Sequence, residues 1–472
     1  MARVLMVASE ATPFAKTGGL ADVVGALAAT LCARGEEVAI VMPRYRSVPL
    51  KGAQCVREHL PVWLAAGSAY EASVWLATDR PVLYYFIDCP PLYDRAGLYG
   101  ETADYPDNYV RFAVLAQAAL AVVRSLFRPD LIHCHDWQTA LVPVYIRTRL
   151  EGDPTFMGLK TLLTIHNLGY QGIYPREILA RIGLDDTLFH PDALEFFGNV
   201  NLLKGGIGYA DALNTVSPTY AREIQTPELG FGLDGLLRAR SDVLSGILNG
   251  ADYAEWNPET DPHLAAHYSA SDLGGKRLCK RDLLAELGLP AENLDRPLIG
   301  MVSRLDTQKG FELIEEAAAG LAAEDCSVAS LLTSTPALEE PLRLWAAAHP
   351  RQVALRIAYD ERLAHQIEAG ADLFLMPSRY EPCGLNQIYS LRYGTVPVVR
   401  ATGGLADTVD EDTGFTFGEY SGAALMEALR AALSAWRDPQ RWRGLMQRGM
   451  AKDFSWEASA AQYAALYRRL AG

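Results

Sequence analysis

The sequence predicts an α/β protein with two Rossmann-like domains. Three observations support this fold class: the chain has 472 residues, half of them hydrophobic (50%); short apolar runs alternate with helical patterns in both halves; and these runs end in polar residues. A chain of this length exceeds one ordinary domain and suffices for two cores. Parallel sheets of this kind bind ligands beyond the carboxyl ends of their strands. We therefore expect two domains facing each other across a deep cleft.

The first half opens with a strand, a glycine-containing turn, a helix and a second strand. Residues 3–8 are an apolar run, residues 9–19 are polar, and residues 20–31 place apolar side chains on one helical face. Alternating apolar and polar residues at about 55–88 predict an inserted hairpin. Further parallel strands are expected at 38–42, 131–134, 161–165, 212–216 and 243–248.

The second half repeats this organisation after a break in periodicity. Residues 249–262 contain Gly, Asp, Asn and Pro without a helical or strand pattern, so they are the best candidate for a linker and hinge. Strands are expected at 298–302, 328–332, 353–357, 373–376 and 396–399. The predicted organisation is an N-terminal domain at 1–248, a C-terminal domain at 263–455, and an amphipathic helix at 456–472 that crosses back to the first domain.

Charge and composition exclude several functions. The formal net charge of −14 argues against nucleic acid or an anionic membrane as a partner, because the long-range field repels both. The longest apolar helix candidate, residues 112–123, is too short to span a membrane. The seven cysteines form no CxxC pair, which is typical of a reducing compartment. We therefore expect a cytoplasmic protein.

The most informative stretch is the polar segment at 377–387. It lies between an apolar run and a helical pattern, so it is predicted to be a strand-to-helix turn, with Pro382 in the first helical turn. Glu381 then lies at the helix start, beside backbone N–H groups that suit phosphate oxygens. A carboxylate beside an anion pocket indicates group transfer from a phosphorylated donor. The alternative is that Glu381 merely complements the helix terminus.

Two cations are predicted at the same sheet edge. Arg304 and Lys309 follow the strand at 298–302, and a diphosphate leaving group needs such positive charge. Their alternative interpretation is a solvated loop. Tyr359, after the strand at 353–357, is placed to stack on a base, although a partly buried structural tyrosine fits the sequence equally well.

The polar strand tips of the first half are candidate ligand contacts. Lys16 precedes Gly18 and Gly19, and such glycines let the backbone approach a ligand. Asp136 and His166 follow later strands, with hydrogen bonding to their own loops as the alternative. No metal constellation is expected, because the side chains of the His133-x-His135-Asp136 cluster are predicted to alternate in direction along a strand. No P-loop or dinucleotide fingerprint is present.

Taken together, these motifs resemble the bacterial glycogen synthase and plant starch synthase family. The resemblance runs in order from about residue 4 to about residue 456. The motifs that carry it are Lys16-Thr17-Gly18-Gly19-Leu20, His135-Asp136-Trp137, Thr164-Ile165-His166-Asn167-Leu168, Thr215–Ile224, Leu248-Asn249-Gly250, Ser303-Arg304-Leu305, Gln308-Lys309-Gly310, Pro377–Leu385 and Thr402-Gly403-Gly404-Leu405.

The resemblance implies a GT-B fold and retaining transfer of glucose from ADP-glucose to the non-reducing end of an α-1,4-glucan such as glycogen or a maltooligosaccharide. It implies neither a metal nor another cofactor. The implied catalytic residues are Glu381, His166, Arg304, Lys309 and Asp136. The implied donor-binding residues are Lys16, Gly18, Gly19, Asn249, Tyr359, Cys383, Gly384, Leu385 and Thr402, with Glu10 and Asp136 near the sugar or acceptor.

The sequence departs from the family pattern at two places, and two other functions are compatible with parts of it. The family's Leu-Leu-Gly-x-Gly turn reads Leu331–Pro336 without glycine, and the position eight residues after Glu381 is Tyr389, a trait of this subfamily. One alternative is a related transferase with a small acceptor such as sucrose or glycerate. The other is a glucan-binding or regulatory protein, which would have no need for charge around a leaving group.

Overall fold

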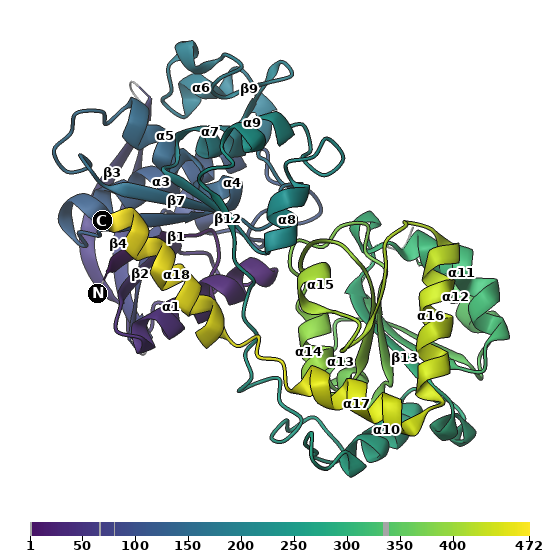
Figure 1. Cartoon of the computed structure of the whole chain (residues 1–472). Coiled ribbons are helices and arrows are strands. Elements are labelled where there is room, and N and C mark those ends of the chain that lie inside the picture. Colours follow the sequence, from purple (N-terminus) through teal and green to yellow (C-terminus); the bar gives the residue numbers. More distant parts are fainter. Residues whose placement is uncertain (1, 66–67, 80, 334–338) are drawn as a thin grey trace. The chain divides into compact units, whose positions relative to one another are not determined.

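The structure, a computed structural model, describes residues 2–65, 68–79, 81–333 and 339–472 (Figure 1). The turn at Leu331–Pro336 lacks the glycines of the family pattern, and its residues 334–336 lie outside the described residues. The chain divides into two compact units. The first comprises Met1–Val216, Ala221–Gly250 and Trp456–Gly472, and the second comprises Ser217–Tyr220 and Ala251–Ser455.

The first unit is built on a nine-stranded sheet with the strand order β12-β11-β7-β6-β1-β2-β5-β4-β3. Its strands are β1 (Arg3–Val7), β2 (Glu37–Pro43), β3 (Gln54–Ala65), β4 (Ser68–Asp79), β5 (Val82–Asp88), β6 (Leu131–His135), β7 (Lys160–Ile165), β11 (Ala212–Thr215) and β12 (Leu244–Gly246). Its main helices are α1 (Gly19–Ala33), α3 (Asn108–Ser125), α5 (Leu141–Thr148), α7 (Leu202–Tyr209) and α18 (Trp456–Ala471).

All strand pairs from β12 to β5 in that order are parallel, as the apolar runs predicted. The hairpin expected at about 55–88 is in fact three strands, β3, β4 and β5, and each pairs antiparallel with the next. β5 lies beside β4 antiparallel and beside β2 parallel, so it joins the insertion to the main sheet. The parallel strands end at one edge, and that edge presents the polar tips.

Helix α18 is fixed to the sheet of the first unit by buried polar contacts. The Tyr467 hydroxyl lies 2.8 Å from Nδ1 of His133 on β6, and Asn214 Nδ2 on β11 donates to the Tyr463 hydroxyl at 2.8 Å. α18 also packs along α1 (Figure 1). The C-terminal helix thus completes the core of the unit that contains the N-terminus.

The second unit is a six-stranded parallel sheet with the strand order β15-β14-β13-β16-β17-β18. Its strands are β13 (Leu298–Arg304), β14 (Ser327–Thr333), β15 (Val353–Ile357), β16 (Leu373–Met376), β17 (Val396–Arg400) and β18 (Phe415–Phe417). Its helices are α10 (Gly274–Glu286), α11 (Phe311–Ala323), α12 (Glu340–Ala348), α13 (Glu361–Gly370), α14 (Asn386–Arg392), α15 (Gly403–Thr408), α16 (Gly422–Trp436) and α17 (Pro439–Met450).

Two apolar layers enclose this second sheet. Side chains of α11 and α16 pack on one face with residues of β13, β14, β16 and β17. Leu283 and Leu284 of α10 and Ile367 of α13 pack on the other face. Helices on both faces confirm the predicted Rossmann-like arrangement for this half.

Residues 251–262 belong to the second unit and pack tightly on it. The Trp256 ring stacks between His365 of α13 and Tyr389 of α14, with centroid distances of 3.7 and 4.1 Å. Asp261 is fully buried. The hinge role expected for this segment stays a prediction.

We expect Tyr467→Phe to lower the free energy of unfolding by about 1–3 kcal/mol, because it leaves a buried imidazole nitrogen of His133 without its partner. Urea titration followed by circular dichroism measures the change. Tyr170→Phe is the control, since Tyr170 is 55% exposed and its loss should have little effect. Equal midpoints for Tyr467→Phe and wild type would show that the hydroxyl contributes nothing.

Candidate active site

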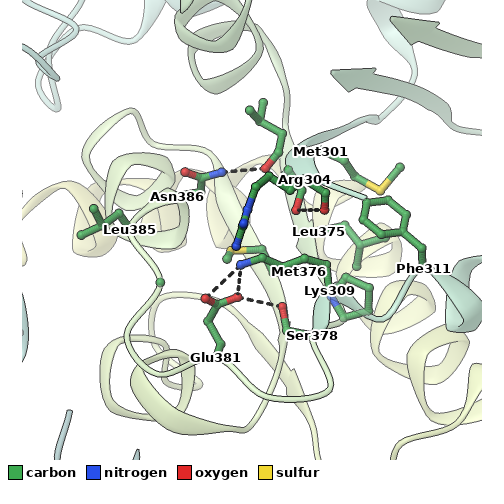
Figure 2. A pocket seen from close by; sticks show the side chains of 14 residues that line it. Met301, Arg304, Lys309, Phe311, Leu375, Met376, Ser378, Glu381, Leu385 and Asn386 are labelled. Carbon is green, nitrogen blue, oxygen red and sulfur yellow. Dashed lines mark hydrogen bonds and ion pairs between the residues drawn. The ribbon is translucent and has the colours of Figure 1, made fainter. Parts of the chain in front are cut away.

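A pocket of about 200 Å³ lies at the carboxyl ends of β13 and β16 in the second unit (Figure 2). The polar residues that line it include Ser303, Arg304, Lys309, Ser378, Glu381 and Asn386, and the apolar ones include Met301, Phe311, Leu375, Met376 and Leu385. Parallel sheets place ligands at this edge. The structure thus brings the two predicted cations and the predicted carboxylate around one cavity.

A buried ion pair lies at the wall of this pocket. Nζ of Lys309 lies 2.7 Å from Oε2 and 3.0 Å from Oε1 of Glu381, and the Ser378 hydroxyl donates to Oε2 at 3.0 Å. Only 5% of Glu381 is exposed. Lys309 is therefore no solvated loop residue. Glu381 contacts this cation and lies in the turn before α14, not at the start of the helix as predicted.

Lys309 is placed by a short turn that the local sequence specifies. The Asp306 carboxylate accepts from the Gln308 N–H at 2.9 Å and caps the 3₁₀ turn Thr307–Lys309. Gly310 follows with φ +71°, and a Cβ there would lie 2.1 Å from the carbonyl oxygen of Pro377. Only glycine allows both that backbone conformation and that close approach.

Arg304 enters the pocket from the end of β13. Its side chain is 62% exposed and lies 3.7 Å from Asp306. Figure 2 shows the Arg304 and Lys309 side chains converging on the Glu381 side of the pocket. Opposite them, Asn386 Nδ2 donates to the Val302 carbonyl at 2.7 Å, which ties the start of α14 to β13.

The Glu381 turn is fixed from behind by a glycine pair. The Gly404 N–H donates to the carbonyl oxygens of Glu381 and Pro382 at 3.1 and 3.2 Å. A Cβ at Gly403 would lie 1.9 Å from the Glu381 oxygen, and one at Gly404 would lie 2.0 Å from the Cys383 oxygen. The Thr402-Gly403-Gly404 segment therefore acts on the pocket through backbone contact.

The other candidates of the second unit occupy three different environments. Gly384 and Leu385 line the pocket. Cys383 and Thr402 are buried and do not line it. Tyr359 is 82% exposed, which excludes the interpretation as a partly buried structural residue. It lies just after β15, two strands away from β13 in the sheet.

The turn differs from the sequence prediction in where its helix begins. α14 starts at Asn386, and Pro382 lies in the bend before it. Pro382 is therefore not part of the first helical turn. Gly384, with φ +72°, extends the bend, and its Cβ position would lie 2.5 Å from Oε1 of Gln387. Backbone contacts with the Thr402-Gly403-Gly404 segment replace the expected early helix.

In the first unit, Lys16, Gly18 and Gly19 lie between β1 and α1. Nζ of Lys16 pairs with Asp22 at 2.9 Å and its side chain is 52% exposed, while nothing lies within 4 Å of a Cβ built on either glycine. Glu10 is buried and accepts from the N–H and hydroxyl of Thr17 at 2.5 and 2.9 Å. Burial raises the pKa of Glu10.

Asp136 and His166 are joined at the tips of β6 and β7. The Asp136 Oδ1 accepts from the His166 N–H at 2.7 Å, and Asp136 adopts φ +56°. Burial raises the pKa of Asp136 to about 7, although the backbone N–H groups of residues 166 and 167 oppose the shift. Burial lowers the pKa of His166 to about 3, so this imidazole is neutral at pH 7.

The sequence interpretation missed His135, which contacts His166 directly. Nδ1 of His135 lies 3.0 Å from Nε2 of His166. The rings of His133 and His135 lie 4.1 Å apart, because residues two apart on a strand share a face. The interpretation that these two side chains alternate in direction was wrong. The i, i+2 spacing was the signal that would have placed His135 on the face of His133.

Asn249 follows β12 at the same sheet edge. It is 7% exposed, and its Oδ1 is buried without a hydrogen-bond partner in the described part of the chain. A buried amide oxygen of this kind costs free energy until a donor reaches it. Asn249 thus joins Lys16, Asp136 and His166 at the tips of parallel strands in this unit.

The two units and the cation-lined pocket define a class, the GT-B glycosyltransferases. Residues 3–239 match the family model described as the starch synthase catalytic domain, and residues 289–444 match that of glycosyl transferases group 1. The predicted α/β fold with two Rossmann-like domains is confirmed.

The chain belongs to the glycogen synthase family. It is 51% identical over 480 residues to a glycogen synthase of Anaeromyxobacter dehalogenans (strain 2CP-C), covering 99% of this chain and 100% of the relative. It is 48% identical over 474 residues to one of Koribacter versatilis, covering 99% and 98%.

Among solved structures, the chain resembles the catalytic domain of starch synthase IV from Arabidopsis thaliana bound to ADP and acarbose. The TM-score is 0.90 at 36% identity, over 100% of this chain and 99% of the other. A sucrose-phosphate synthase from Thermosynechococcus elongatus shares the fold at a TM-score of 0.60 and 20% identity. None of the helices in the described ranges has the length and apolar character that crossing a membrane requires.

We expect Gly404→Ala to displace the Glu381 turn, because the new Cβ would overlap the Cys383 backbone. Activity should fall at least about tenfold, as a misplacement near 1 Å costs more than that in positioned reactions. Initial rates and melting temperature are measured together. Gly418→Ala is the matched control, since nothing lies within 4 Å of its Cβ position. Equal rates for both variants would contradict the prediction that the backbone contact at Gly404 positions Glu381.

Proposed function

We propose that this protein transfers glucose from ADP-glucose to the non-reducing 4-hydroxyl of an α-1,4-glucan and retains the anomeric configuration. The observation that carries the proposal is the pocket in which Arg304, Lys309 and Glu381 converge. The family and the ADP and acarbose bound to the Arabidopsis starch synthase IV structure support the same donor and acceptor classes.

The charges of the pocket suit a departing diphosphate. When the bond between the glucose C1 and the phosphate oxygen breaks, negative charge develops on ADP, and positioned cations stabilise it. Arg304 is exposed toward the cavity, and Lys309 is already held beside Glu381 at 2.7 Å. The two cations therefore bind the diphosphate, while Glu381 lies beside the transferred glucose and favours its positive charge in the transition state.

The acceptor hydroxyl attacks C1 from the face that the diphosphate leaves, so the configuration is retained. Its proton passes to the departing phosphate oxygen. In the first unit, the neutral His166 donates or accepts a hydrogen bond with the sugar, and Asp136 orients its backbone. Glu10 and the unpartnered Asn249 oxygen contact the sugar or acceptor. These roles are our proposal.

The remaining donor contacts follow from exposure and position. Tyr359 offers an uncovered ring for the adenine. Lys16, Gly18 and Gly19 contact the donor from the loop before α1, and Gly384 and Leu385 do so from the pocket wall. Cys383 and Thr402, both buried, support that wall. The reaction needs no metal and no cofactor in this proposal, because Arg304 and Lys309 supply the positive charge, and we place it in the cytoplasm.

We expect kcat/KM to be higher with ADP-glucose than with UDP-glucose. Radiolabelled donors, each supplied with glycogen or maltooligosaccharides, measure the preference and the linkage of the product. Sucrose and glycerate serve as control acceptors and should remain unlabelled. Equal or greater efficiency with UDP-glucose would overturn the donor assignment, and labelled sucrose would overturn the acceptor.

Glu381→Ala should lower kcat at least about a hundredfold, because the carboxylate acts on the glucosyl group. ADP affinity should be kept or increased, since Lys309 loses its partner and is left for the diphosphate. Steady-state kinetics and calorimetric titration with ADP measure the two effects. Glu411→Gln, at an exposed position, is the control. Near-normal turnover would return Glu381 to a structural role.

A further inference from the structure

A second cluster of potential ligands lies in the second unit, outside the donor pocket. Glu255, Glu361 and His365 each direct a ligand atom to one place, and these atoms lie within 4.8 Å of one another. None of the three lines the pocket around Glu381. Glu361 and His365 are one turn apart on α13 and share a face of that helix, while Glu255 comes from the segment after the first unit.

His365 is built into the protein like a metal-ligating histidine. It is 1% exposed, and its Nδ1 lies 2.7 Å from Oδ2 of Asp261, which is itself fully buried. The Tyr393 hydroxyl donates to the same carboxylate oxygen at 2.5 Å, and the His263 N–H donates to Oδ1 at 2.9 Å. A carboxylate that holds the second nitrogen of a ligating imidazole is the usual outer contact of zinc sites.

The hydrogen bonds of Asp261 assign the proton on the imidazole. Both oxygens of Asp261 accept hydrogen bonds, Oδ2 from the Tyr393 hydroxyl and Oδ1 from the His263 N–H. Asp261 therefore acts as an acceptor toward His365 as well, which assigns the proton to Nδ1 of the imidazole. Nε2 then presents a lone pair. It is buried and has no hydrogen-bond partner in the described part of the chain.

We propose that Nε2 of His365 and the carboxylates of Glu255 and Glu361 bind a divalent transition-metal ion, with Zn²⁺ the best match. One imidazole and two carboxylates form a donor set that zinc accepts, with water in the fourth position. Calcium and magnesium prefer oxygen ligands alone. Both glutamates are exposed, and zinc holds carboxylate oxygens at about 2.0–2.2 Å.

The position of the site indicates a structural role. Glu255 precedes Trp256, whose ring stacks on His365 at 3.7 Å. A bound ion would therefore add a direct link between residues 251–262 and α13. The chain leaves the first unit at Gly250, so this link anchors the connecting segment to the second unit. The proposal does not depend on the transfer reaction, in which the metal takes no part.

Isothermal titration of the chelator-stripped full chain with ZnCl₂ tests the site. We expect one saturable equivalent and a rise in melting temperature with zinc. Glu361→Gln and Glu255→Gln should each weaken binding at least about tenfold, the range that perturbed zinc sites show. The matched control is Glu259→Gln, an exposed glutamate of the same segment outside the cluster.

The glutamate variants decide the outcome without relying on His365, whose removal also deprives Asp261 and Trp256 of a contact. Loss of the bound equivalent in Glu255→Gln/Glu361→Gln, with unchanged glucosyl transfer rates, supports the site. Absence of saturable binding to the wild-type chain overturns it. So does binding that is equally tight in Glu361→Gln, because zinc would then occupy another part of the surface.

Discussion

The pocket at the carboxyl ends of β13 and β16 depends on the buried ion pair between Lys309 and Glu381. Side-chain exposures of 18% and 7% mean that neither charge is well solvated, and removing one partner of such a pair leaves the other uncompensated. The surrounding structure keeps the pair in place: Asp306 and Gly310 position the lysine, and Gly403 and Gly404 hold the backbone of the glutamate turn. A diphosphate that attracts Lys309 would weaken the ion pair and leave the negative charge of Glu381 less compensated. The leaving group and the carboxylate would then be coupled electrostatically through the same cation.

Much of the fold was predictable because buried parallel strands are apolar runs with polar ends. β1, β6 and β7 of the first sheet and β13 and β16 of the second each coincide with such a run. Because these strands are parallel within their own sheet, their polar ends lie at one edge of that sheet. The convergence of Arg304, Lys309 and Glu381 was predictable for the same reason. The residue at which α14 starts was not predictable, because Pro382 is compatible with either a bend or a first helical turn. The bend is stabilised by Gly404, which lies distant in sequence and leaves no local signal.

Contacts between residues distant in sequence were the part that sequence reasoning could not supply. Nothing local indicates that His133 meets Tyr467, or that Asp261 meets His365 and Tyr393. These pairings depend on how helices pack against the sheet, which apolar periodicity constrains only in outline. The contact between His135 and His166 is an intermediate case. Strand alternation puts His135 on the same face as His133, but the register of β6 against β7 decides whether the His135 ring contacts His166 at the end of β7.

The left-handed backbone at Asp136 restricts how this position can evolve. Most side chains cost roughly 1–2 kcal/mol in that conformation, whereas Asp, Asn and Gly adopt it more readily. Of these, glycine removes the oxygen that accepts the His166 N–H, and asparagine keeps an oxygen but loses the titratable group. A lineage drifting under selection for stability alone would therefore have one substitute, asparagine, that keeps the loop conformation and the acceptor for the His166 N–H but loses the carboxyl group. The fold would not record the change.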